Sequence, residues 1–499
     1  MKARIYLFSG LFAMGLTAGA ATTTEAGTLK NQLSDAELNG SSLTVTGPID
    51  ASDFETLLGM TNLTSLDLSG ATIVEYNGDK LLSGSVHSDA NAIPNYAFIG
   101  SKITSVKLPS TLTAIGEGAF AGSKIQAIEF PASLKSIGNS AFNNCDNLKQ
   151  VNVAAGIETG NYVFANCANL ETASLNSIEV PVGAFRNCPK LETAYISQSV
   201  KSIGADAYAG CSKLTTISFW PTLETIGNSA FYGTGLEIAD LSRCGNMTAI
   251  GDNVFADCLN LTTVYFPANI TSLGSGLFFD NISLTDIKDF PTGLTEIPDH
   301  FMKGASNVNS LDMMNERIES IGHYAFHNLN GVERWKAPDS LRYIGDGAME
   351  GWTSLEYIDA SMVNLVPELG EDVWAGVENK DKIGLSVPDN LFEQFKATPQ
   401  WQDFDLELSG VNTGIEDDFA GEASKISITL VGSELQVEAP SEIENVVVYN
   451  VAGRLLVAAR GLDTTKTVID MSNLTPEVII VTVNTAAGTQ KTVKFVFKG

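Results

Sequence analysis

A short pattern of apolar residues, glycine and proline returns about every 21 to 25 residues along this chain, and it limits the possible folds more than any other feature. One unit runs from Ile103 to Phe120, with the pairs Ile115-Gly116 and Ala119-Phe120 near its end. The final aromatic position marks about thirteen units and is held by Phe98, Phe120, Phe142, Phe164, Phe185, Tyr208, Phe231, Phe255, Phe278, Phe301, Phe326, Met349 and Trp374. One unit cannot bury its own apolar face, so neighbouring units must stack as the coils of a solenoid.

Within a unit, apolar and polar residues alternate in a way that indicates a short strand. Val106 and Leu108 flank Lys107, which places the first two inside the coil and the lysine outside. Gly116 is typical of a tight turn. Because little chain remains for a helix, we expect a β-rich solenoid of short parallel strands joined by turns or 3₁₀ segments.

The repeat resembles the BspA-like leucine-rich repeats of surface proteins from Gram-negative anaerobes. The resemblance rests on the recurring Leu-Thr-Ser/Thr, Pro, Ile-Gly and Ala-Phe-x-x-Cys elements, of which residues 261–274 hold a typical copy. It covers residues 93–377, and the Ile-Gly pair is missing from the copies at residues 171–185 and 284–301, the second of which also carries an extra residue before Pro291. Such a resemblance implies adhesion to extracellular matrix or host cells.

The segments that flank the repeats have the composition of caps. Residues 27–92 resemble the N-terminal cap of this family, with a short helix expected from Asp50 to Met60. Residues 378–408 are the expected C-terminal cap, in which Phe392 and Phe395 share one face of a helix. Residues 409–424 are rich in glycine and acid and lack periodicity, which is typical of a linker.

The last segment, residues 425–499, has the strand and turn pattern of a small Ig-like β-sandwich. The predicted strands are Ile426–Val431, Leu435–Glu438, Val446–Asn450, Leu455–Ala458, Thr467–Asp470, Ile479–Val483 and Thr492–Phe497, with Ala452-Gly453 as the clearest hairpin turn. Residues 448–455 and 469–474 resemble the C-terminal sorting domain of type IX secretion cargo, although Glu477-Val478-Ile479 stands where that family has Gly-Val-Tyr. A secretion address and a spacer or anchor module are both open.

The first residues have the three parts of a secretory signal peptide. Lys2 and Arg4 precede an apolar run from Ile5 to Leu16, and Ala18-Gly19-Ala20 has the pattern of a cleavage site. We therefore expect residues 1–20 to be a signal peptide. The expected location is the cell surface or the medium, with the periplasm as the alternative, and no later apolar run approaches the length of a membrane span.

The charge and the reactive side chains exclude several functions from the prediction. The net charge of −28 repels phosphate backbones, so we expect no nucleic-acid partner. His323 and His327 have the spacing of a helical metal pair but lack a third ligand, and we expect them at the surface. No residue pattern indicates catalysis, a cofactor or a metal site, so we expect no enzyme activity.

The cysteines form a predicted column in the solenoid. Five of them lie three residues after the aromatic position, namely Cys145, Cys167, Cys188, Cys211 and Cys258, and Cys244 lies outside this column. Stacked coils would bring their Cα atoms within reach of a disulfide. Ser123 and Thr234 stand at equivalent positions, which favours buried free thiols over disulfides.

Outward-facing aromatic residues are the candidate ligand-binding site. Tyr195 and Tyr265 occupy the position of Lys107, and Trp220 replaces a strand-closing proline. Because Tyr and Trp are favoured at recognition surfaces, these three residues predict a site on a concave strand face. The expected partner is an extracellular protein or glycan, host matrix included, bound by a monomer. The alternative is a structural surface or spacer protein without a defined ligand.

Overall fold

The chain consists of two compact units, one up to Leu406 and one from Glu407. The computed structural model describes residues 19–79, 81, 86–408, 426–431, 433–450, 454–475, 477–486 and 490–497. Residues 1–18 of the predicted signal peptide, the linker at 409–424 and the Ala452-Gly453 turn lie outside the described residues.

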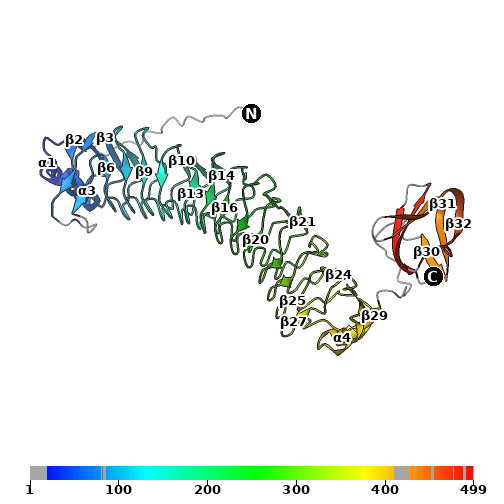
Figure 1. Ribbon diagram of the computed structural model, residues 1–499. Helices are drawn as coiled ribbons and strands as arrows, with labels where there is room; N and C mark the ends of the chain where they lie inside the picture. Colours follow the sequence, from blue (N-terminus) through cyan, green and yellow to red (C-terminus); the bar gives the residue numbers. More distant parts are fainter. Residues whose placement is uncertain are drawn as a thin grey trace. The chain divides into compact units, whose positions relative to one another are not determined.

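The first unit is a β-solenoid in which each coil contributes up to two short strands (Figure 1). The first strand column contains β3 (Ser65–Ile73), β7 (Ser105–Lys107), β10 (Gln150–Val153), β12 (Thr172–Leu175), β14 (Thr193–Ile196), β17 (Ile238–Asp240), β19 (Thr263–Tyr265), β21 (Asp286–Lys288), β24 (Arg334–Lys336), β26 (Tyr357–Asp359), β28 (Gly384–Val387) and β29 (Asp405–Leu408). Neighbouring strands are parallel and in register, as Val151 opposite Ala173 illustrates. The β-rich solenoid predicted from the repeat is therefore confirmed.

A second strand column lies where the sequence predicted turns or 3₁₀ segments. It contains β6 (Ala92–Ile93), β8 (Ala114–Ile115), β9 (Ser136–Ile137), β11 (Glu158–Thr159), β13 (Glu179–Val180), β15 (Ser202–Ile203), β16 (Thr225–Ile226), β18 (Ala249–Ile250), β20 (Ser272–Leu273), β22 (Glu296–Ile297), β23 (Ser320–Ile321), β25 (Tyr343–Ile344) and β27 (Glu368–Leu369). Gly116 follows β8 and donates its backbone N–H to the carbonyl of Ile93 at 2.9 Å. A Cβ on Gly116 would lie 2.6 Å from the backbone nitrogen of Asn95, so glycine serves close coil approach here rather than the predicted tight turn.

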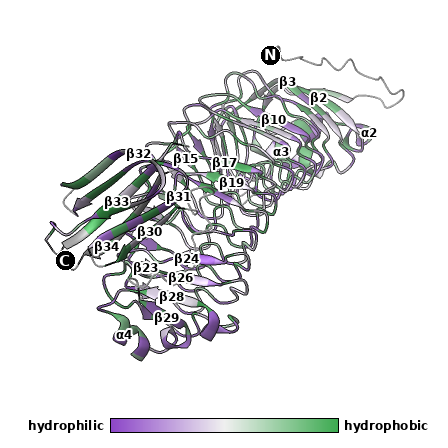
Figure 2. Ribbon diagram, turned by 90° about the vertical axis from the view of Figure 1, so that its right-hand side faces the viewer, coloured by the Kyte–Doolittle hydropathy of each residue, from purple (hydrophilic) through white to green (hydrophobic). Residues whose placement is uncertain are grey.

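The core of the first unit is a stack of aromatic rings along the solenoid axis. From Phe98 to Phe278, consecutive ring centroids are 5.1–6.1 Å apart and consecutive ring planes differ by at most 27°. Figure 2 shows the matching alternation of apolar and polar segments along the coils. Each buried large side chain stabilises the fold by about 1.5–3 kcal/mol.

The predicted aromatic column is wrong by one residue at Phe301. The ring of Phe301 lies at 68° to that of Phe278, so the stack ends there. Phe278 donates its backbone N–H to Phe301, whereas Phe120 donates to Ala141, the residue before the next aromatic. Met302 therefore takes the aromatic position, because the extra residue before Pro291 shifts this coil along the chain.

Two tight bends close each coil without a helix. They lie two residues before and two residues after the core aromatic, as Ser140 and Asn144 do around Phe142, and both have positive φ angles near 55–60°. Glycine, Asn and Asp hold most of these positions because they tolerate the left-handed region.

The N-terminal cap contains β1 (Gly19–Thr22), α1 (Leu29–Gln32), α2 (Asp35–Leu38), β2 (Ser42–Ile49), α3 (Ala51–Gly59), β4 (Tyr76–Asn77) and β5 (His87–Ser88). The helix α3 lies within the predicted residues, begins with a capping box of Asp50 and Asp53, and buries Phe54 and Leu57. The predicted cleavage triplet overlaps β1, in which Ala20 pairs with Thr44 of β2.

The C-terminal cap contains η1 (Lys380–Lys382), α4 (Phe392–Ala397) and η2 (Trp401–Asp403). Phe395 of α4 is buried, and its ring centroid lies 5.5 Å from that of Trp401. Phe392, predicted on the same face, is only partly buried against the core.

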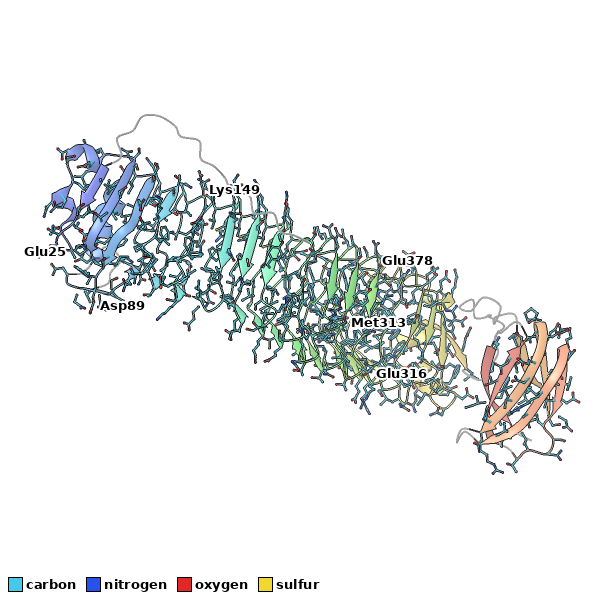
Figure 3. All side chains as sticks on the ribbon, turned by 90° about the horizontal axis from the view of Figure 1, so that it is seen from above. Glu25, Asp89, Lys149, Met313, Glu316 and Glu378 are labelled. Carbon is cyan, nitrogen blue, oxygen red and sulfur yellow. The ribbon has the colours of Figure 1, made fainter. Side chains whose placement is uncertain are left out.

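The repeats before the C-terminal cap are also joined by ion pairs at their surface. Glu316, labelled in Figure 3, lies in the coil that precedes β24 and forms an ion pair with Lys336 of β24.

The thiols in the core act as hydrogen-bond donors between coils. Each of the five column thiols donates to the carbonyl of the core aromatic in the preceding coil, with Cys145 to Phe120 at 3.2 Å, Cys167 to Phe142 at 3.3 Å, Cys188 to Phe164 at 3.2 Å, Cys211 to Phe185 at 3.1 Å and Cys258 to Phe231 at 3.1 Å. Trp352 uses its Nε1 for the same bond to Phe326, at 2.8 Å. The five column cysteines are buried and free, as predicted, and Cys244, for which no state was predicted, is buried and free as well.

Alkaline pH is expected to destabilise the first unit through these thiols. Burial raises the pKa of Cys211 to about 12 and that of Cys258 to about 11, from an ordinary value of 9.0. Stability is then complete below pH 9 and falls as pH rises towards 11 to 12, by about 3 kcal/mol for Cys258 and about 4 kcal/mol for Cys211. Urea unfolding at pH 8 and 10.5 measures the slope, and Cys258→Ala is expected to reduce it. Rapid thiol labelling of the native protein at pH 8 would contradict this account.

Replacing Tyr208 with phenylalanine is expected to stabilise the first unit by about 1 kcal/mol. Tyr208 is fully buried between Phe185 and Phe231 in the aromatic stack. Its hydroxyl has no hydrogen-bond partner among the described residues, so its desolvation is uncompensated. Urea midpoints of Tyr208→Phe and of the reverse change Phe185→Tyr check this, and a lower midpoint for Tyr208→Phe would show that the hydroxyl is bonded.

The second unit is one bent antiparallel sheet over its own core. It contains β30 (Ser427–Val431), β31 (Glu434–Asn450), β32 (Leu455–Asp470), β33 (Glu477–Thr485) and β34 (Gln490–Phe497), in the order β30-β31-β33-β34 with β32 on β31. The seven short strands of the prediction become five, because β31 continues through Pro440 and β32 through Gly461, with register breaks near both. Val437, Val448 and Val481 are among the buried residues of this core.

Candidate functional site

The three aromatic residues predicted as a ligand site do not come together. Tyr195 in β14 is 62% exposed, and Tyr265 in β19 is half-buried. Trp220 packs partly against the core, as the buried Pro109 does at the equivalent position, and its buried Nε1 has no partner among the described residues. The strandless coil 214–220 separates the sheets of β14 and β19. Ligand binding by these residues stays a prediction, but Trp220 is not the exposed neighbour that the sequence suggested.

The predicted concave position of these residues is also wrong. In Figure 1 the first unit bends so that β16, β20 and β25 lie on the inner side and β14, β21 and β24 on the outer side. The inner side therefore carries the second strand column. The glycines of this column let the backbones of neighbouring coils approach closely, which fits a bend toward this side.

The second strand column presents mostly small residues to the outside. Its outward positions hold Ala114, Ser136, Ser202, Thr225, Ala249, Ser272 and Ser320, with Glu158, Glu179, Glu296, Tyr343 and Glu368 between or after them, while Ala92 of β6 is buried. Because glycine follows most of these strands, little side-chain volume covers the backbone. We call this face of residues 92–370 the Ile-Gly groove.

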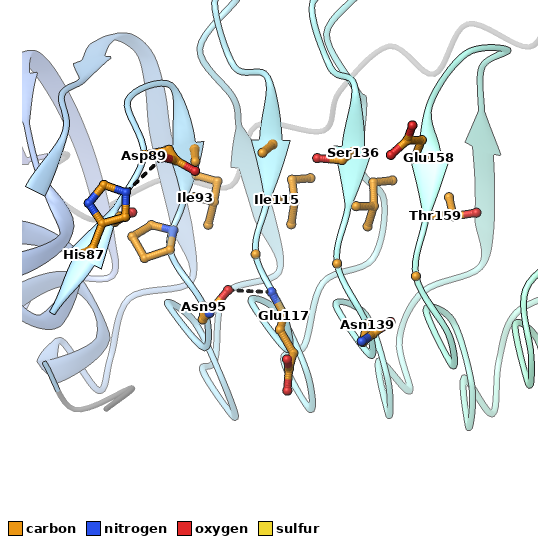
Figure 4. Close-up of a pocket in the computed structure, with 18 of the residues that line it drawn as sticks. His87, Asp89, Ile93, Asn95, Ile115, Glu117, Ser136, Asn139, Glu158 and Thr159 are labelled. Atoms are coloured by element: carbon orange, nitrogen blue, oxygen red, sulfur yellow. Dashed lines mark hydrogen bonds and ion pairs between the residues drawn. The ribbon is translucent and has the colours of Figure 1, made fainter. Parts of the chain in front are cut away.

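The groove is hollowed near the N-terminal cap, over β6, β8, β9 and β11 (Figure 4). This hollow has a volume of about 530 Å³. His87 borders it and contacts Asp89 at 3.0 Å through Nε2. Glu117 accepts a hydrogen bond from the hydroxyl of Tyr96, while Glu158 is exposed on the next wall. The hollow is thus polar and acidic, with a glycine floor.

A second hollow of about 500 Å³ lies over β18, β20, β22, β23 and β25. Asp252, Glu296, Asp299, His323 and Tyr343 line it, together with serines and Gly274. The ring centroids of His323 and Tyr343 are 6.4 Å apart. Burial, followed by the charges of neighbouring carboxylates, raises the pKa of Tyr343. Among the described residues, neither hollow is lined by lysine or arginine.

One wall of the groove is a ladder of side-chain acceptors. The side chain after the glycine position accepts the backbone N–H of its counterpart in the next coil, with Asn95 bonded to Glu117 at 2.8 Å, Asn139 to Asn161 at 2.8 Å, Asn161 to Val182 at 3.2 Å, Asn228 to Asp252 at 3.0 Å, Asp252 to Ser275 at 2.9 Å, Asp299 to His323 at 2.7 Å, His323 to Asp346 at 3.0 Å and Asp346 to Glu371 at 2.7 Å. The bond from the Asp346 N–H ends on Nδ1 of His323, which also lies 3.1 Å from Oδ2 of Asp346.

The histidines of the first unit serve the coils rather than a metal. His323 is part of the ladder, and His327 is mostly covered beside Glu350, 3.1 Å away. Within the part of the chain that the structure describes, no group of three or more metal-ligating side chains is present.

Sequence reasoning missed the groove because it treated Ile-Gly as a turn. The signal was present in the repeat, since the residue before Ile is small in most units and the residue after Gly is often Asn or Asp. Read as a strand, the same pattern places a small side chain outside and a hydrogen-bonding side chain beside it.

The two units of the chain match different family models. A family model described as the BspA type leucine rich repeat region matches residues 91–180, 178–309 and 295–390. A model described only as a domain of unknown function matches residues 415–497. No relative was found among curated proteins.

Several solved structures are similar to this chain. A leucine-rich repeat protein from Bacteroides ovatus aligns with a TM-score of 0.57 and 22% identity, over 74% of this chain and 87% of its own. A leucine rich cell surface protein from Faecalibacterium prausnitzii has a TM-score of 0.38 and 24% identity, over 56% and 86%. The pneumococcal vaccine antigen PcpA has a TM-score of 0.36 and 14% identity, over 80% and 91%. The first of these shares the solenoid fold. Among the described residues, no helix is long and apolar enough to cross a membrane.

Proposed function

This chain belongs to the BspA type leucine-rich-repeat family, and we propose that it is an exported, non-enzymatic protein that binds an extracellular macromolecule along the Ile-Gly groove. The observation that supports this most is the strip of small outward residues that runs beside the glycine column and opens into two hollows. Solenoids use extended concave surfaces for binding, and this strip lies on the inner side of the bend (Figure 1).

The composition of the strip supports a ligand rather than simple solvation. A surface that needs only solubility can carry long charged side chains at every outward position, yet most positions here hold Ala, Ser or Thr. Small side chains leave backbone groups within reach of a partner. A host matrix protein or a surface glycan is therefore the proposed class of partner, and adhesion at the cell surface is the proposed role.

The second unit has its own proposed role. Its five-stranded sheet has a core separate from that of the solenoid, which supports an independent module. We propose that it is an address or attachment module, of the kind that its resemblance to type IX sorting domains suggests. Secretion of a reporter fused to residues 407–499, compared with the reporter alone, separates an address from a plain spacer.

A binding screen tests the proposed function. The chain from Gly19 to Gly499, which keeps β1, is presented to extracellular matrix proteins and a glycan array. A Tyr195→Ala/Tyr265→Ala variant runs in parallel, because Tyr195 on the first strand column is exposed. A saturable partner that the variant keeps supports the groove, and loss in the variant would move the site to the first column. No partner at micromolar concentration would favour the structural spacer.

A further inference from the structure

Two aspartates that line the second hollow, Asp252 and Asp299, are also acceptors in the side-chain ladder, but the ladder does not need their negative charge. In the N-terminal coils the ladder is built from Asn95, Asn139 and Asn161, whose amide oxygens accept the backbone N–H of the next coil at 2.8–3.2 Å. In the C-terminal coils Asp252 and Asp299 make the same bond at 2.9 and 2.7 Å. Because asparagine satisfies the same backbone group, the aspartate charges are not needed for this bond.

The carboxylates of Asp252, Glu296 and Asp299 all line the second hollow of the groove. One ladder oxygen of Asp299 accepts the N–H of His323, which leaves the other carboxylate oxygen for solvent or a ligand. Glu296 is exposed on the neighbouring outward position and lines the same hollow. Asp346 follows two coils later, lies outside the lining of the hollow, and has its Oδ2 3.1 Å from Nδ1 of His323. The nearby Arg342 is paired with Glu319 at 3.3 Å and does not line the hollow.

We infer that the second hollow binds an extended, lysine- or arginine-rich peptide segment of a protein partner. The inference rests on the proposed binding role of the Ile-Gly groove. The hollow crosses the coils of β18, β20, β22, β23 and β25, which at about 4.8 Å per coil spans roughly 20 Å. An extended peptide rises about 3.3 Å per residue, so about six residues fit.

The chemistry of the walls supports this choice over a glycan or an anionic polymer. Asp252, Glu296 and Asp299 can accept bonds from ammonium or guanidinium groups. The ring of Tyr343 offers a face to a cation, as Tyr324 does for Lys303 at 4.9 Å elsewhere in this unit. Small serines leave room for the peptide backbone. An acidic polymer would meet only like charge here.

The test uses a labelled hexapeptide of alternating Lys and Ser, with a Glu-Ser hexapeptide as the opposite-charge probe. The variant Asp252→Asn/Glu296→Gln/Asp299→Asn removes the three carboxylate charges that line the hollow and keeps both ladder acceptors. The control Asp240→Asn/Asp312→Asn/Asp359→Asn removes three charges that lie outside the hollow. Both variants are expected to unfold at the wild-type temperature.

Fluorescence anisotropy at low salt is expected to show binding of the Lys-Ser probe only. The groove variant should bind it about tenfold more weakly, the combined effect of three exposed ion pairs, and the control less than twofold. Equal loss in both variants would show an effect of net charge alone and overturn the inference. No binding to the wild type would also overturn it. The proposed function fails separately, if the partner screen finds nothing.

Discussion

Replacing Trp374 with alanine is expected to lower the free energy of unfolding of the first unit by about 3–5 kcal/mol. Trp374 is fully buried where the repeats meet the C-terminal cap. Its ring centroid lies 5.5 Å from that of Trp401 and 5.2 Å from that of Phe404, and Trp335 and Trp352 flank it at 6.0 and 6.2 Å. The cavity would uncouple the cap from the last coils, and a solenoid end without its cap exposes its core.

Tryptophan fluorescence reports this change at the place where it occurs. Four of the five tryptophans of the chain lie in this cluster, with only Trp220 elsewhere. In Trp374→Ala the fluorescence transition should precede the circular dichroism transition, because the C-terminal coils melt first. The exposed Met362→Ala serves as the control and should change stability by less than about 0.5 kcal/mol. Coincident transitions at the wild-type midpoint would contradict the capping role.

Replacing Gly274 with alanine is expected to destabilise the first unit by about 3 kcal/mol. A Cβ at this position would lie 2.3 Å from the carbonyl carbon and oxygen of Gly251 in the preceding coil. Those atoms are backbone and cannot rotate away. The two coils would have to separate, which weakens the bond from the Gly274 N–H to the carbonyl of Ile250, now 2.9 Å long.

Gly245 provides the matched control for this substitution. No atom outside its chain neighbours lies within 4 Å of a Cβ built there, and its φ angle is not positive. Gly245→Ala should therefore be neutral or stabilise the protein slightly, because alanine restricts the unfolded chain. Urea unfolding of both variants measures the difference. Similar midpoints for the two would mean that the glycine column is not set by coil approach.

The solenoid fold was predictable because every unit repeats the same buried apolar and aromatic positions. Phe120 and its counterparts fill one core position, and repetition makes the assignment strong even where single copies are irregular. The shift at Met302 could have been read from the spacing, because the core position lies five residues after the Ile of the unit, as Phe120 does after Ile115 and Met302 does after Ile297. The backbone bonds from Phe278 to Phe301 and from Met302 to Ala325 agree with this spacing.

The binding surface was predictable only in part. Tyr195 is exposed as an outward strand residue should be, because alternation fixes the side to which a side chain points. Trp220 could not be placed, since its coil forms no strand and its ring is partly covered by the core. The direction of bending depends on spacing between coils, which a single unit does not encode.

The measurement that tests the central claim most directly is the affinity of the partner from the binding screen for two blocked variants. Ser272→Trp places a large ring in the second hollow, and Ser218→Trp places the same ring on an exposed position of the other face. Binding through the Ile-Gly groove predicts that Ser272→Trp loses the partner while Ser218→Trp keeps the wild-type affinity. Retained binding by Ser272→Trp, or loss only in Ser218→Trp, would contradict it.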